Sequence, residues 1–194
     1  RGLGDVYKRQ VGYDVKRVMN ITDVGHLSSD ADTGEDKMLK GAKREHKTVM
    51  EVAKFYADAF FEDCRKLNIK KADVVEPATH CIPEFIHMIE VLLKKGYAYQ
   101  AGGNVYFDTS RLEDYFVFSS AVEKEQLQVG VRDDVEEDEN KRNKNDFVLW
   151  FTKSKFEDQA LKWDSPWGVG YPGWHIECSC ICLLYTSPSP RDTE

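Results

Sequence analysis

The sequence predicts an α/β fold in which a parallel β-sheet is interrupted by an inserted α+β segment. A short β-branched strand at residues 15–21 precedes a long amphipathic helix that begins after Thr48, which together make half of a β-α-β unit. The later chain has a different pattern, with one helix, a hairpin and a buried strand, before a loop rich in glycine and tryptophan. The expected units are residues 11–76 (sheet fold), 77–161 (insertion) and 162–181 (return to the sheet fold).

Composition describes an ordinary globular protein, with 41% hydrophobic and 31% charged residues in a chain of 194. The net charge of −7 argues against a protein that binds nucleic acid over its whole surface, but it leaves room for a local basic patch. We expect no transmembrane helix, because no apolar run approaches about 18 residues. Five irregularly spaced cysteines do not form a disulfide framework, so a reducing cytoplasm is expected.

The two ends of the chain fit neither neighbouring pattern. Residues 1–10 and 182–194 resemble translated sequencing-adaptor read-through, and a disordered tail is the alternative interpretation. On the first interpretation the remaining residues are an internal fragment of a longer protein.

The first unit contains a strand that ends near Thr22 and a helix opened by a capping box, in which Glu51 follows Thr48 by three residues. Helical spacing places a set of apolar side chains on one face of that helix. The set is Val49, Val52, Ala53, Tyr56, Phe60, Cys64 and Leu67. We expect this face to pack against the core, with Cys64 as a core thiol.

The second unit begins with a helix that Pro83 opens and Gly96 ends. A hairpin is expected around residues 101–103, followed by a buried strand at residues 147–151. The acidic run at residues 133–139 is expected to be a solvated loop. His80 and Cys81 precede the helix and are interpreted as structural, because no second pair of ligands lies at metal-binding spacing.

The loop and helix start at Trp163–Cys178 contain three of the four tryptophans. Trp174 and Cys178 are four residues apart, so a helix would place the indole and the thiol on one face. Spacing alone favours a buried cysteine under a packed tryptophan. On a helix Cys178 and Cys180 point in different directions, which leaves Cys178 alone as a candidate metal ligand.

Two short strings connect these features to a known family. Asn-Ile-Thr-Asp at residues 20–23 and Pro-Gly-Trp-His-Ile-Glu-Cys-Ser at residues 172–179 resemble cysteinyl-tRNA synthetases, which are class I aminoacyl-tRNA synthetases. Residues 34–38, 40–45 and 163–168 resemble the same family in order and spacing. The resemblance runs from about residue 11 to residue 179.

The resemblance implies a class I catalytic domain, which has a nucleotide-binding, Rossmann-like parallel sheet split by a connective insertion. It implies an enzyme that activates cysteine with ATP, accompanied by Mg²⁺, and transfers the cysteine to tRNA(Cys). A monomeric, cytoplasmic enzyme without membrane attachment is expected. No catalytic residue of this chain is assigned.

The resemblance also implies roles for four residues. Cys178 would be one of four zinc ligands, and Thr22, Trp174 and His175 would line the pocket for the amino acid. Cysteine differs from serine by one atom, and an apolar pocket separates such near-isosteres by only about 1–3 kcal/mol. A zinc ion with an exchangeable position binds a thiolate far better than a hydroxyl, so zinc would select the substrate.

The sequence also departs from the family pattern. It contains neither the His-x-Gly-His nor the Lys-Met-Ser-Lys-Ser signature, nor the other three zinc ligands, nor an anticodon-binding domain. We therefore expect the 194 residues alone to be inactive and not to bind zinc tightly. Three alternatives stay open: a ligase that joins cysteine to an amino sugar, a non-catalytic synthetase-like binding protein, and a zinc-free domain in which Cys178 is merely buried.

Overall fold

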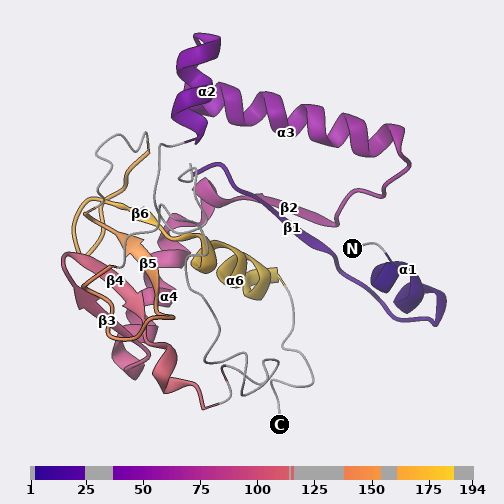
Figure 1. Ribbon diagram of the computed structural model, residues 1–194. Coiled ribbons are helices and arrows are strands. Elements are labelled where there is room, and N and C mark those ends of the chain that lie inside the picture. The colour runs from indigo at the N-terminus through magenta and orange to yellow at the C-terminus, as the bar shows by residue number, and fades with distance from the viewer. Residues whose placement is uncertain (1–2, 25–36, 114, 116–137, 154–160, 186–194) are drawn as a thin grey trace.

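Two small β-sheets and the helices around them make up the described part of the protein (Figure 1). The computed structural model describes residues 3–24, 37–113, 115, 138–153 and 161–185. Within these ranges no helix is both long enough and apolar enough to cross a lipid bilayer.

The first sheet is a parallel pair of strands. Strand β1 (Val18–Ile21) pairs with β2 (Val74–Pro77), with Val18 opposite Val74 and Ile21 opposite Pro77. Helices α2 (Lys37–Glu45) and α3 (Val49–Lys66) lie between the two strands in the chain. Figure 1 shows the pair running between α3 on one side and α6 on the other. The predicted half of a β-α-β unit is thus confirmed, and β2 completes it.

Helix α3 begins at the predicted capping box. Thr48 Oγ1 accepts a hydrogen bond from the Glu51 backbone N–H at 3.2 Å, and the Thr48 N–H donates to Glu51 Oε2 at 2.8 Å. These bonds satisfy backbone groups that the first turn of a helix leaves without partners.

The prediction that the apolar face of α3 is buried is wrong for most of its length. Val52 is 5% exposed, whereas Tyr56, Phe60 and Leu67 are 49%, 47% and 72% exposed. Cys64 is only partly buried. Helical periodicity identifies which face is apolar, but it carries no information about what packs against that face.

The insertion begins with a 3₁₀ turn, η1 (Ala78–Cys81), and helix α4 (Ile82–Lys95). Pro83 lies in the first turn, and Gly96 ends the helix in the left-handed conformation with φ 78°, as predicted. Cys81 is buried, and burial raises the pKa of its thiol to about 11. His80 is exposed, with Nδ1 3.3 Å from Glu76 Oε1.

The second sheet is antiparallel, with strand order β3-β4-β5-β6. Its strands are β3 (Ala98–Ala101), β4 (Asn104–Phe107), β5 (Phe147–Phe151) and β6 (Tyr171–Pro172). The first three confirm the predicted hairpin and buried strand. Strand β6 comes from the loop after residue 161, so this sheet extends beyond the segment expected as the insertion.

Helix α6 (Trp174–Tyr185) packs against β1, α4 and β5 and so joins the two sheets. Its buried residues Ile176, Cys180 and Ile181 belong to the main hydrophobic core. The helix continues past residue 181, and the Tyr185 hydroxyl donates to Glu76 Oε2 at 2.6 Å. Near the other end, α1 (Leu3–Gln10) places Arg9 3.2 Å from Asp73.

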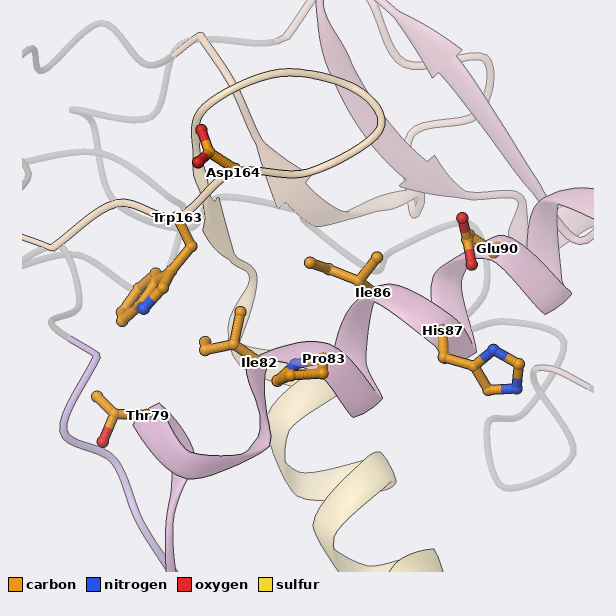
Figure 2. A pocket seen from close by; sticks show the side chains of 8 residues that line it. All are labelled: Thr79, Ile82, Pro83, Ile86, His87, Glu90, Trp163 and Asp164. Carbon is orange, nitrogen blue, oxygen red and sulfur yellow. The ribbon is translucent and has the colours of Figure 1, made fainter.

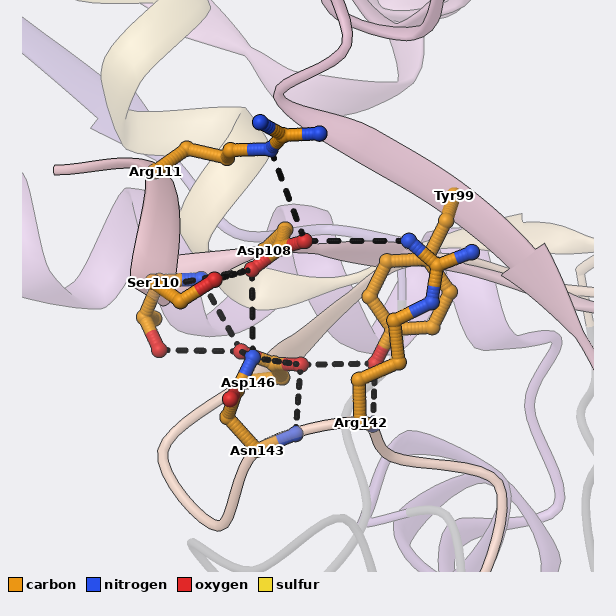
Figure 3. A network of polar contacts seen from close by, with 8 residues as sticks. Tyr99, Asp108, Ser110, Arg111, Arg142, Asn143 and Asp146 are labelled. Carbon is orange, nitrogen blue, oxygen red and sulfur yellow. Dashed lines mark hydrogen bonds and ion pairs between the residues drawn. The ribbon is translucent and has the colours of Figure 1, made fainter.

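A polar network centred on Asp146 holds the loop before β5 against the hairpin (Figure 3). The Tyr99 hydroxyl donates to Asp146 Oδ2 at 2.7 Å, and the Thr109 backbone N–H donates to Oδ1 at 2.9 Å. The Asn143 backbone N–H also donates to Asp146 Oδ2, at 3.0 Å. Burial would raise the pKa of Asp146, but these hydrogen bonds outweigh it and hold the pKa below its ordinary value.

Most of the predicted acidic loop lies outside the described residues. Asp138 is described, and it is partly buried rather than solvated, because the Tyr106 hydroxyl donates to its Oδ2 at 2.7 Å. The expectation of a solvated loop is therefore wrong for this residue.

Candidate functional site

The candidate site lies where the carboxyl end of β1 meets the first turns of α6. Asn20 is half-buried in the strand, and Thr22 follows the strand and is exposed. The next residue, Asp23, is 5% exposed and accepts hydrogen bonds from the Thr79 backbone N–H (2.9 Å) and hydroxyl (2.6 Å). These bonds fix the end of β1 to the start of η1.

The start of α6 is fixed on the antiparallel sheet. Pro172 pairs with Trp150, and the Gly173 N–H donates to the Leu149 carbonyl at 2.9 Å. A Cβ atom at Gly173 would collide with the Val148 carbonyl oxygen, so only glycine allows this close approach. The sharp change from strand to helix at this glycine determines where the side chains of α6 point.

Asn20 connects two of the predicted site residues. Its Nδ2 atom lies 3.7 Å from Cys178 Sγ and 3.4 Å from Thr22 Oγ1. Thr22 and Cys178, which are far apart in the sequence, thus share one polar neighbour.

The two other predicted site residues lie on the first turn of α6. Trp174 is 51% exposed, on the same helical face as Cys178. His175 is also exposed, and its ring centroid lies 4.5 Å from that of Phe147 on β5. The structure therefore pairs His175 with the antiparallel sheet and Cys178 with the parallel one.

The three cysteines of α6 differ in their surroundings. Cys178 and Cys182 are exposed, whereas Cys180 is buried in the core. Burial raises the pKa of Cys180 to about 11, which keeps it a neutral thiol. The alternative in which Cys178 is merely buried under Trp174 is wrong, because both side chains reach the surface.

Two cavities flank this region. One, of about 450 Å³, lies between residues 19–22 of β1 and its end and the apolar face of α3, and Asn20 and Thr22 line it. The other, of about 480 Å³, lies between α4 and the loop at Trp163 (Figure 2). Figure 2 shows Trp163 and Asp164 on one side of it and Ile82, Pro83 and Ile86 on the other. The second cavity contains none of the four predicted site residues.

The chemistry of the site suits a soft metal ion only in part. Cys178 offers an exposed sulfur ligand, which is a donor that zinc prefers. In the described ranges no three His, Cys, Asp or Glu side chains are grouped as metal ligands. The residues therefore fit zinc as one contributor to a larger ligand set.

A comparison with protein families matches residues 4–187 to the model described as tRNA synthetases class I (C) catalytic domain. The chain belongs to this family. The α/β architecture and the parallel pair agree with a partial Rossmann-like fold of a class I catalytic domain, as the sequence predicts.

Similar proteins carry the name cysteine–tRNA ligase. The chain is 54% identical to that of Treponema denticola over 177 residues, which is 91% of this chain and 35% of the relative. It is 51% identical to that of Treponema pallidum (strain Nichols) over 181 residues, which is 92% of this chain and 35% of the relative. It is 49% identical to that of Borrelia garinii subsp. bavariensis over 177 residues, which is 91% of this chain and 36% of the relative. The chain thus spans about a third of the length of these curated relatives.

Sequence reasoning missed Asn20 as a site residue. The only local signal was that Asn20 precedes Thr22 by two residues at the end of the predicted strand, where alternate residues face the same side. What the sequence lacks is the contact between β1 and α6, which depends on how the two sheets pack.

Proposed function

We propose that the longer protein is a cysteine–tRNA ligase and that this chain is part of its catalytic domain. The activity would be the ATP-dependent activation of cysteine, with Mg²⁺ accompanying the nucleotide, and transfer of the cysteine to tRNA(Cys). Membership of the class I family and the names of the similar proteins support the reaction class. We place the enzyme in the cytoplasm as a monomer without membrane attachment.

The observation that carries the proposal is the meeting of an exposed thiol with the carboxyl end of a parallel strand. In open α/β sheets ligands bind outside the carboxyl ends of strands, which is where Thr22 lies. Cys178 approaches that point from α6, with Asn20 between the two side chains. A site that selects a thiol substrate needs a sulfur-binding element next to the substrate pocket.

In this proposal Thr22 contributes a hydroxyl and Trp174 an apolar wall to the pocket for cysteine. His175 would border the same pocket from the side of Phe147, against which its ring packs. The cavity that Asn20 and Thr22 line, about 450 Å³, has the size of a small-molecule site, and Thr22 is the one predicted site residue in its lining.

Cys178 would be one of four ligands of a zinc ion. Bound zinc would supply a Lewis-acidic position that holds the substrate sulfur as a thiolate at neutral pH. The part of this chain that the structure describes offers one ligand at the site and no cluster of three. We therefore expect the isolated 194 residues to bind zinc weakly and to be inactive.

The test is the Cys178→Ser variant of the full-length enzyme. We expect it to lose bound zinc, measured by metal analysis after dialysis, and to reject serine less well in the ATP–pyrophosphate exchange assay. Cys182→Ser is the matched control, because that thiol is also exposed on α6 but lies one turn further on. It should retain zinc and selectivity.

Retention of zinc and of serine rejection in Cys178→Ser would contradict the proposed ligand. The acceptor is tested separately, by supplying tRNA(Cys) or an amino sugar to the wild-type enzyme with cysteine and ATP. We expect product only with the tRNA. Product with the amino sugar would instead support the ligase of low-molecular-weight thiol synthesis, and no activity with either would support a non-catalytic binding protein.

A further inference from the structure

We propose that Asn20 is a positioning residue that donates a hydrogen bond to the Cys178 sulfur and thereby tunes the thiolate that holds the metal. This inference rests on the proposed function, because it concerns the zinc-bound state of Cys178. Asn20 is not itself a metal ligand. Its expected effect is on the affinity for the metal and on the bond between the metal and Cys178, and not on substrate binding alone.

The polarity of the contact supports this role. The Asn20 side chain turns its amide nitrogen, which is the donor end, towards Sγ at 3.7 Å. A metal-bound thiolate has no proton and can only accept hydrogen bonds, so the amide nitrogen is the group that suits it. The two N–H bonds of the same nitrogen allow a second contact, with Thr22 Oγ1 at 3.4 Å.

Both partners are held by rigid structure. The backbone of Asn20 lies in the parallel pair opposite Glu76, and Asp23 fixes the strand end through Thr79. Cys178 lies on α6 next to Glu177, whose side chain is fully buried. Because the donor and the acceptor lie on two packed elements, their geometry is set before the metal binds. Little side-chain entropy is then lost on metal binding, as a contact that supports a metal ligand requires.

Such contacts have known consequences for a metal centre. Outer-shell hydrogen bonds hold a metal ligand in its orientation, and mutation of such a partner typically lowers metal affinity or activity by about 10–100-fold. The second contact gives Asn20 a further effect, because a shift of its amide moves Thr22 as well. One amide would therefore couple the position of the metal ligand to that of a hydroxyl in the substrate pocket.

The test uses the full-length enzyme with the variants Asn20→Ala and Asn20→Asp, the second of which keeps the shape but removes the donor. We expect zinc affinity, measured by competition with a chromogenic chelator, to fall about 10-fold or more in both. In the cobalt-substituted enzyme the thiolate-to-cobalt absorption band should move to longer wavelength. Without the N–H donor the sulfur lone pair is higher in energy.

Controls separate this inference from general damage and from the proposed function. Gln100→Ala removes an exposed amide on β3 and should change neither zinc affinity nor the cobalt band. Thr22→Val should alter the KM for cysteine and shift the cobalt band less than Asn20→Ala does, because the Asn20 donor to the sulfur remains. Circular dichroism and thermal melting of each variant report whether it is folded.

Each result supports or overturns the inference. An unchanged cobalt band and unchanged zinc affinity in folded Asn20→Ala and Asn20→Asp would overturn it, while loss of zinc in Cys178→Ser would leave the proposed function standing. If Cys178→Ser itself keeps zinc, the proposed function fails, and the inference fails with it.

Discussion

At the scale of single residues, the carboxylate of Asp146 joins three separate parts of the insertion. It is 2% exposed, and it accepts hydrogen bonds from Tyr99 on β3, from Thr109 after β4 and from Asn143 in the loop before β5. A buried carboxylate is costly unless donors surround it, and here they do. The ionised form of Asp146 is therefore the one that stabilises the fold.

We predict that Asp146→Asn lowers the free energy of unfolding by about 1.5–3 kcal/mol at pH 7, the usual contribution of hydrogen bonds to a charged group. The folded pKa of Asp146 is lowered, so its contribution is complete above its ordinary pKa of about 3.9. The contribution is lost as the pH falls through the lower, folded pKa. Urea denaturation of the 194-residue chain between pH 7 and pH 3 measures both effects.

The difference between wild type and Asp146→Asn should shrink as the pH falls below about 4. Asp164→Asn is the control, because Asp164 is exposed on the loop, and it should change stability by less than about 0.5 kcal/mol. A difference between wild type and Asp146→Asn that is the same at pH 7 and pH 3 would contradict this account.

Sequence reasoning at this scale depends on whether a residue acts through its neighbours in the chain or through space. The Thr48–Glu51 capping box could be predicted, because both partners lie within one helical turn. The contacts of Asp146 with Tyr99 and of Asn20 with Cys178 could not, because these partners lie 47 and 158 residues away in the sequence. Their roles exist only in the folded chain.

At the scale of elements, the junction between β6 and α6 depends on close backbone contact with β5. A Cβ atom at Gly173 would meet the Val148 carbonyl, and one at Gly170 would meet the Phe151 carbonyl. Both obstacles are backbone atoms, which cannot rotate away. The glycines of this loop therefore determine how near α6 starts to the sheet, and with it the position of Cys178.

We predict that Gly173→Ala destabilises the chain by about 1–3 kcal/mol or more, because the strand and the helix must separate to admit the methyl group. Gly4→Ala is the matched control, since no atom lies within 4 Å of a Cβ there. Thermal melting of the two variants provides the measurement. Equal melting temperatures for wild type and Gly173→Ala would contradict this prediction, because the junction would then admit the methyl group without a loss of stability.

Most elements of the insertion follow from local signals, but strands β2 and β6, on either side of it in the chain, do not. Helix α4 has a proline at its start and a left-handed glycine at its end, and the hairpin has a two-glycine turn. Strand β6 contains two residues, and β2 ends at a proline, so neither offers a periodic pattern. Their pairing depends on partners already in place.

At the scale of the whole molecule, the exposed aromatic side chains of α3 are a departure from an ordinary globular surface within the part of the chain that the structure describes. Tyr56 and Phe60 line the cavity at the end of β1 and are 49% and 47% exposed, and the neighbouring Phe55 is 52% exposed. Adjacent exposed aromatic side chains form a surface to which other apolar groups bind.

We predict that the 194-residue chain binds the dye ANS at this face. Phe60→Ser should reduce the dye fluorescence and change stability by less than about 0.5 kcal/mol, because the side chain is already half in water. Phe85→Ser replaces a fully buried residue of α4, and it should unfold the chain. ANS fluorescence that is the same in wild type and folded Phe60→Ser would place the dye elsewhere.

The separation in sequence between Asn20 and Cys178 determines when their contact can form. The hairpin of β3 and β4 closes a very short loop, whereas the contact between Asn20 and Cys178 spans 158 residues. Longer loops lose more chain entropy on closure, and non-local pairings form slowly. During synthesis on the ribosome the strand emerges long before the helix that completes the site. We therefore expect the contact between the thiol and its amide partner to form late in folding.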